Sequence, residues 1–305
     1  MLINADTLTN LLGTMRMDYA TAMQEAAKPM PGWVREMPSV TAYEDFPIAM
    51  FLATMRRWKG PRQFAGLDVK KLHIVNADHE LSWAIPTNDL EDDKIGYIRP
   101  VMQQAGRNAA NYPRKLCIET LRTNGLWLDG AAFYGTSRTV GNSGTLTNYA
   151  TGALTETTFN TAYLALQNNL LPNGAPAGVV PTTLIVGPKN RTVAHGIVNQ
   201  GPGATAANPN SGIVKVEVTP ELVGTYDDYW FLVDENTFGP PVLWLNRKKG
   251  EIVAMDKPTD STVFLGSIGD GVDGVVPGGV NCYGIHSRGE GALALPWAIY
   301  GAFVS

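Results

Sequence analysis

Residues Leu90–Ala110 read LEDDKIGYIRPVMQQAGRNAA, and this stretch decides the fold. It lies within a long helix predicted over 89–124. Asn88 is a plausible N-cap for this helix, and Glu91 follows three residues later, as in a capping box. Apolar residues then recur at the three-and-four spacing of a helix face: Ile95, Ile98, Met102, Ala105 and Ala109. The stretch therefore predicts one long helix with a buried stripe.

The start of this predicted helix is strongly acidic. Glu91, Asp92 and Asp93 crowd its first turn, where the helix dipole favours negative charge. A metal site would be another use for three neighbouring carboxylates, but the dipole accounts for them without a ligand. Pro100 and Pro113 fall inside the helical pattern and are expected to kink or interrupt the helix.

Immediately upstream, residues 46–87 predict a long β-hairpin. Its return limb alternates apolar and polar residues over 75–85, which is the period of a strand. Four basic residues lie between the limbs: Arg56, Arg57, Lys59 and Arg62. They are too few for a nucleic-acid site. Two interpretations stay open, namely solvated surface charge or contact with an acidic patch on a neighbouring molecule.

Further from the centre, the pattern alternates helices and strands. Residues 6–26 predict an amphipathic helix, followed by a proline-rich connector. Downstream of the long helix, helices are predicted over 155–170 and 188–198. Short strands are predicted over 182–186, 214–218, 230–233, 242–245, 252–255 and 262–265, and closing strands over 281–304. This order predicts an α+β fold.

The composition points to a folded chain with few charges. Of 305 residues only 17% are charged, with a net charge of −4, against about 25% in an ordinary domain. Neither half is basic enough for nucleic-acid binding. The intervals 157–188 and 192–214 contain no charged residue. They indicate either loop-rich polar surface or surface that meets other protein in an assembly, where charge is depleted.

The cysteines and the terminal segments indicate the cellular compartment in which the protein is found. Cys117 and Cys282 are far apart in sequence, which favours buried free thiols over one long-range disulfide. The N-terminus lacks the features of a signal peptide, and the apolar stretch 292–304 is too short to span a bilayer. We therefore expect a cytosolic product that is not exported and has no membrane partner.

No catalytic template fits the sequence. Gly269–Gly274 matches GxGxxG, but no helix is predicted to follow it. Gly141–Thr145 lacks the last glycine of a nucleophile elbow. His73 and His79 are expected on one strand face, as solvated or interface histidines. Asp227 is expected in a turn that enters a buried strand. The sequence predicts no catalytic, cofactor-binding or metal-binding residue and no enzyme.

Three segments resemble one known family. They are Leu90–Ala110, the upstream Trp58-Lys59-Gly60-x-Arg62, and the C-terminal Tyr283-Gly284-Ile285-His286-Ser287-Arg288 with its following strand through Trp297. These residues resemble the Mu-like phage major head subunit family over about 40–135 and 280–300. Between 140 and 275 the similarity is weak, and the family's His-Pro after the paired aromatics is missing here.

This resemblance implies the Hong Kong 97 type capsid fold, an α+β fold. The implied parts are an N-terminal arm (1–45), an extended β-hairpin loop (46–87), a peripheral domain with a long spine helix (88–152), an axial domain (153–275), and closing strands that return to the peripheral domain (276–305). The implied function is a major capsid protein that self-assembles into the icosahedral head of a tailed double-stranded DNA phage. No catalysis is required.

The resemblance also implies partners. Hexamers and pentamers of the chain would form the shell, assembled in the bacterial host cytoplasm and ending in the virion. A portal, a separate scaffolding protein and a possible decoration protein are expected, and packaged DNA would be faced non-specifically. We expect Arg56, Arg57, Lys59 and Arg62 to meet Glu91, Asp92 and Asp93 of a neighbour. Alternatives are another virion protein, such as a tail tube or decoration protein, or a small soluble hydrolase.

Overall fold

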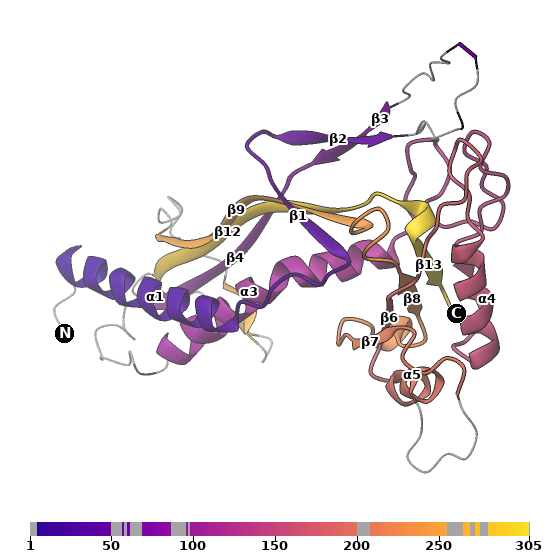
Figure 1. The fold of residues 1–305 in the computed structure, drawn as a ribbon. Coiled ribbons are helices and arrows are strands. Elements are labelled where there is room, and N and C mark those ends of the chain that lie inside the picture. The colour runs from indigo at the N-terminus through magenta and orange to yellow at the C-terminus, as the bar shows by residue number, and fades with distance from the viewer. Residues whose placement is uncertain are drawn as a thin grey trace.

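The computed structural model describes most of the chain: residues 5–49, 57, 60–61, 69–86, 96, 98–199, 208–254, 265–268, 272–274 and 280–304. It consists of an elongated part built on a four-stranded sheet and a second part built on a five-stranded sheet (Figure 1). The long helix α3 (Ile98–Arg122) runs along the first part towards the second.

The four-stranded sheet has the order β1-β9-β12-β4. Strand β1 (Val34–Pro38) is parallel to β9 (Val242–Ala254), whereas β12 (Val280–Leu293) is antiparallel to both β9 and β4 (Ala77–Pro86). Sequence analysis placed two separate strands within β9. In the structure, these two segments and the polar residues between them form one continuous strand. It pairs with β12, with register shifts near Arg288.

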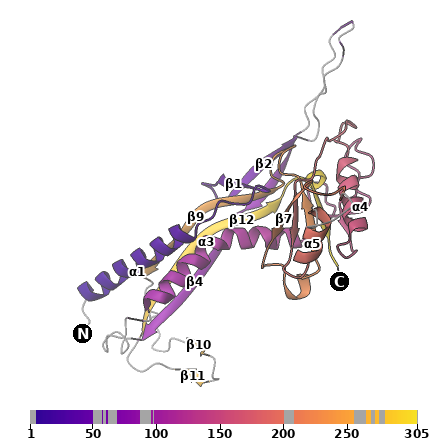
Figure 2. The same ribbon diagram turned by 60° about the horizontal axis from the view of Figure 1, so that its bottom comes forward.

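Helices α1 (Ala5–Ala26) and α3 lie side by side along the sheet (Figures 1 and 2). Their facing side chains form one core cluster with the strands, and this cluster includes Met15, Tyr19, Ile98, Met102 and Ile285. The amphipathic helix predicted over 6–26 is confirmed, as is the described part of the stripe on α3. The proposed cap Asn88 and the acidic turn after it lie outside the described residues.

The two helices cross closely at Gly106. A Cβ atom at this position would lie 2.5 Å from the Tyr19 carbonyl oxygen and 3.1 Å from the Ala22 Cβ, so no other residue fits without moving α1. Tyr19 also donates a hydrogen bond of 2.9 Å to the Gly250 carbonyl. Burial, together with the charge of Glu251, raises the pKa of Tyr19 to about 12.

A second pair of strands, β2 (Tyr43–Ala49) and β3 (Val69–Val75), forms an antiparallel hairpin. It leans away from the four-stranded sheet (Figure 1). The hairpin expected over 46–87 is thus shorter than the sequence indicated. Its return limb ends at Val75, and the following β4 leaves to pair with β12. On β4, the Ile85 side chain is buried in the cluster that also contains residues of α1 and α3.

The second part contains a five-stranded sheet of order β5-β13-β8-β6-β7. Its strands are β5 (Tyr149–Ala150), β13 (Ile299–Ala302), β8 (Trp230–Val233), β6 (Thr183–Val186) and β7 (Lys215–Val218). Helices α4 (Glu156–Gln167) and α5 (Arg191–Val198) pack with this sheet around Phe159 and Trp230. Smaller elements are the 3-10 turns η2 (Gly224–Tyr226) and η3 (Pro296–Ala298) and the strand pair β10 (Leu265–Ile268) and β11 (Val272–Gly274).

The two sheets do not follow the residue ranges expected for the domains. Strand β9 comes from the range 153–275 but lies in the four-stranded sheet, and β13 comes from 276–305 but lies in the five-stranded sheet. Both crossings follow from long-range strand pairing, which sequence order does not reveal. The chain therefore passes between the two sheets several times.

Candidate assembly interface

The β2–β3 hairpin is anchored at its base and exposed along its outer face. Ile48 and Ile74 are buried in the central core cluster, and Phe46 and Leu72 pack against it. These side chains alternate along the strands, so one face of the hairpin packs inwards while the other is left for solvent or another molecule.

The outer face of the hairpin carries paired charges. Asp45 lies 2.9 Å from His73 Nδ1 and 3.7 Å from Lys71 Nζ. The hydrogen bond from His73, aided by the charge of Lys71, holds the pKa of Asp45 below its usual value. The Tyr43 ring packs against the His73 ring in a tilted arrangement, with centroids 4.6 Å apart. Because Tyr43, Asp45, Lys71 and His73 alternate with the inward-packed residues, this outer face presents mixed polar and aromatic groups.

A hydrogen-bonded cluster fixes the hairpin to the sheet. The Asn76 side chain donates to Ser39 Oγ at 2.7 Å and to the Thr41 carbonyl at 3.0 Å. Ser39 Oγ in turn donates to Glu44 at 2.9 Å, while the Ser39 backbone N–H donates to the Asn246 carbonyl of β9. Asn76 and Ser39 are both buried, so the direction in which the hairpin leaves the body is fixed by buried polar contacts.

The charged residues expected at an interface are placed only in part. Arg57 is exposed. Arg56, Lys59 and Arg62, and the acidic group Glu91, Asp92 and Asp93, lie outside the described residues. Their pairing between neighbouring molecules stays a prediction.

The two histidines lie in different places from those expected, whereas the aspartate pair lies where the sequence placed it. His73 and His79 do not share a sheet, because the chain branches at Asn76 between them. His79 instead hydrogen-bonds Tyr112 of α3 at 3.1 Å. Asp227 and its neighbour Asp228 both bind Lys189, at the turn before β8, as the sequence indicated.

Sequence analysis missed a joint between the two parts of the molecule. Glu217 on β7 accepts a hydrogen bond from the Trp33 indole N–H at 3.0 Å and one from Arg114 on α3 at 2.8 Å. Arg122, further along α3, stacks over the Tyr226 ring with its guanidinium 4.1 Å from the centroid. More than a hundred residues separate Glu217 from Arg114, so no local pattern could have revealed the pair.

The uncharged interval 157–188 supplies an outward helix face. Exposed residues of α4 recur there at helical spacing, namely Thr157, Thr161 and Leu164, and Asn168 continues the row. Leu164 is 56% exposed, and Val180 in the same interval is 51% exposed. These residues give the second part of the molecule a surface without charge, which is typical of the centre of protein–protein interfaces.

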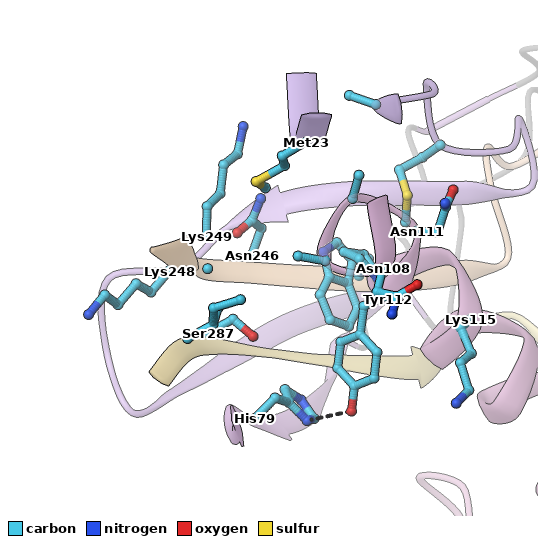
Figure 3. A pocket seen from close by; sticks show the side chains of 18 of the residues that line it. Met23, His79, Asn108, Asn111, Tyr112, Lys115, Asn246, Lys248, Lys249 and Ser287 are labelled. Carbon is cyan, nitrogen blue, oxygen red and sulfur yellow. Dashed lines mark hydrogen bonds between the residues drawn. The ribbon is translucent and has the colours of Figure 1, made fainter. Parts of the chain in front are cut away.

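A cavity of about 630 Å³ lies between the C-terminal part of α1, the middle of α3 and the four-stranded sheet. Figure 3 shows Met23 above it, Asn108, Asn111 and Tyr112 on the helix side, and Lys248 and Lys249 on β9. The lining combines apolar side chains with basic ones.

In the described part of the chain, side chains that could do chemistry do not gather into one site. Within those residues, no group of three or more His, Cys, Asp or Glu side chains could hold a metal ion. Cys117 is free and buried, and burial raises the pKa of its thiol. Of the GxGxxG match, Val272–Gly274 form strand β11, and the first three residues lie outside the described part of the chain. Among the helices described, none has the length and apolar character needed to cross a membrane.

Comparisons with known proteins agree with this architecture. Residues 8–153 match the family model of the Mu-like prophage major head subunit gpT, and residues 87–277 match that of the phage capsid protein family. The major capsid protein of Escherichia phage Mu is 24% identical over 122 residues, which is 40% of either chain. The matched segment thus spans less than half of that relative.

Solved structures resemble the chain over nearly its whole length. The procapsid of bacteriophage JBD30 matches with a TM-score of 0.52 at 18% identity, covering 98% of this chain and 76% of that one. The virus-like particle from Pyrococcus furiosus matches with a TM-score of 0.53 at 12% identity, covering 95% and 98%. The chain has the Hong Kong 97 type capsid fold, and since the second family model covers more than half of it, the chain belongs to the phage capsid protein family.

Proposed function

We propose that this chain is the major structural subunit of the icosahedral head of a tailed double-stranded DNA phage. Family membership supports a structural role without catalysis. The observation that carries the proposal is the β2–β3 hairpin, which projects from the body although its base is held by buried polar and apolar contacts. A projecting hairpin with a fixed direction and a mixed polar and aromatic outer face is suited to contact with a neighbouring subunit.

The proposed division of labour follows the parts of the chain. Residues 1–45 serve as an N-terminal arm, 46–87 as the extended loop, 88–152 as the peripheral domain, 153–275 as the axial domain, and 276–305 as closing strands. Strands β9 and β13 are exceptions to these bounds, since each lies in the other part's sheet. The uncharged outer face of α4 supports placing the axial domain where subunits meet around the centre of a capsomer. Repetition of such heterologous contacts closes rings of subunits and then a shell.

The proposal extends to the partners of the shell. Hexamers and pentamers of the chain form in the bacterial host cytoplasm and persist in the virion. A portal and a separate scaffolding protein act in assembly, and a decoration protein is a further candidate partner. The inner surface of the shell faces the packaged DNA without sequence preference. The net charge of −4 supports this last point, because a negative shell does not hold DNA tightly.

Charge reversal at the hairpin tests the proposal. Arg57→Glu combined with Arg62→Glu should stop shell formation, because both residues are proposed to face acidic groups of a neighbour. Sedimentation velocity of the purified protein then shows small species, whereas the unaltered chain sediments as closed shells. Arg57→Lys with Arg62→Lys keeps the charge and is the matched control.

Circular dichroism is needed beside sedimentation, because it separates lost assembly from lost folding. We expect the charge-reversed variant to keep the spectrum of the unaltered subunit. Normal shells from this variant would contradict the proposed contact. An unaltered chain that remains monomeric or dimeric under all assembly conditions would contradict the proposed function itself.

A further inference from the structure

Large apolar side chains form part of the lining of the cavity beside α3. Met23 and Met30 line it from the N-terminal segment, and Leu81, Trp244 and Ile285 line it from three strands of the sheet. Its volume of about 630 Å³ falls within the range of pockets that bind ligands, roughly 300–1,000 Å³. A cavity of this size and character can take an aromatic or long aliphatic side chain from a partner.

Basic residues also line this cavity. Lys28, Lys248 and Lys249 line the cavity, and among the described residues no carboxylate lies within ion-pair distance of any of them. In Figure 3, Lys248 and Lys249 extend from β9, whereas Lys115 lies at the opposite end, on α3. Basic side chains outnumber acidic ones in the lining, whose carboxylates are Glu36, Glu80 and Glu221, and Glu36 is already bound to Asn246 at 2.6 Å.

Uncharged hydrogen-bonding groups complete the lining. Asn108, Asn111 and Ser287 lie at the cavity in Figure 3. Asn111 uses one side-chain N–H for the Arg107 carbonyl, which leaves its amide oxygen to accept a further hydrogen bond. Such amide and hydroxyl groups can pair with the backbone of an extended or helical peptide.

We propose that this cavity is a docking groove for an acidic peptide segment of another protein, with one large apolar side chain inserted as an anchor. Charge complementarity between the lysines and the acidic segment would set orientation and association rate, and the anchor would supply most of the affinity. The inference goes beyond the proposed function and does not depend on it, because binding is measured on unassembled subunits.

Charge argues against other occupants of the groove. The chain's own hairpin presents Arg57, Lys70 and Lys71 as exposed basic residues, and a second copy inserting it here would meet like charge. Nucleic acid fits the lysines but not the interior, because phosphate binding needs no apolar cavity. An acidic segment with an apolar anchor matches both parts of the surface.

Fluorescence anisotropy of a labelled peptide tests the proposal. The probe is a short helical peptide with Leu and Trp on one face and Glu on the other, added to the purified full-length subunit. Lys248→Glu with Lys249→Glu should weaken its binding about tenfold or more. Arg107→Glu with Arg191→Glu makes the same change in net charge at exposed residues outside the cavity lining, and should leave binding unchanged.

Filling the cavity gives an independent readout. Asn111→Trp adds bulk from an exposed helix position and should abolish binding while leaving thermal unfolding of the subunit near that of the unaltered chain. The proposal is overturned by equal binding of a peptide with Lys in place of Glu, or by unchanged binding to the Lys248 and Lys249 variant. Displacement of the peptide by oligothymidylate would also overturn it and would assign the surface to nucleic acid.

Discussion

Replacing Glu217 should loosen the joint between the two parts of the molecule. Its carboxylate binds Trp33 and Arg114 at once, at 3.0 and 2.8 Å, and its side chain is only 16% exposed. Trp33 is fully buried, so its indole N–H would find no water in exchange. Arg114 is 28% exposed and would be partly rehydrated.

The expected cost of Glu217→Ala follows from these two donors. A buried donor left without an acceptor costs about 1–3 kcal/mol. The lost bond to Arg114 adds about 1 kcal/mol after allowance for solvent screening. We therefore expect the free energy of unfolding to fall by about 2–4 kcal/mol. Glu217→Gln keeps an acceptor for Trp33 and should cost about 1 kcal/mol.

Urea unfolding of the full-length subunit, followed by circular dichroism, measures this difference. The matched control is Lys215→Ala on the same strand, because Lys215 is 57% exposed in its ion pair with Glu235 and such pairs contribute less than about 1 kcal/mol. A Glu217→Ala midpoint equal to that of the control would refute the argument that this carboxylate holds the joint.

Two further predictions concern packing and pH. Gly106→Ala should destabilise the subunit by about 1–3 kcal/mol in thermal unfolding, because its methyl group meets the Tyr19 carbonyl, and an unchanged midpoint would contradict the close helix crossing. Burial opposes ionisation of Asp129, but hydrogen bonds from Arg138 prevail and lower its pKa. The stabilisation by ionised Asp129 is therefore present above the carboxyl's ordinary pKa of about 4 and lost as pH falls through the lowered value. Asp129→Asn should therefore make the unfolding midpoint depend less on pH across that acidic range.

Local patterns in the sequence were sufficient for the helices and for several short strands. The stripe through Met102 on α3 and the periodicity around Tyr19 on α1 both place buried residues correctly, because helix amphipathicity is a local property. The apolar run of β6 was equally clear, since every residue of that strand is buried.

Long-range pairing was beyond the reach of these patterns. The alternation around Asn76 continues from β3 into β4, so the sequence could not show that the two strands enter different sheets. The polar middle of β9 hid one continuous strand for a similar reason. The Glu217 joint unites residues from three distant segments, and the cavity beside α3 exists only once α1, α3 and the sheet have packed.

A cryo-electron microscopy map of the particles formed by the purified chain tests the central claim most directly. The account predicts closed icosahedral shells, in which the β2–β3 hairpin of each subunit lies over a neighbouring subunit and the uncharged face of α4 is covered by another copy. Particles that are not closed shells, or shells in which the hairpin contacts only its own subunit, would contradict it.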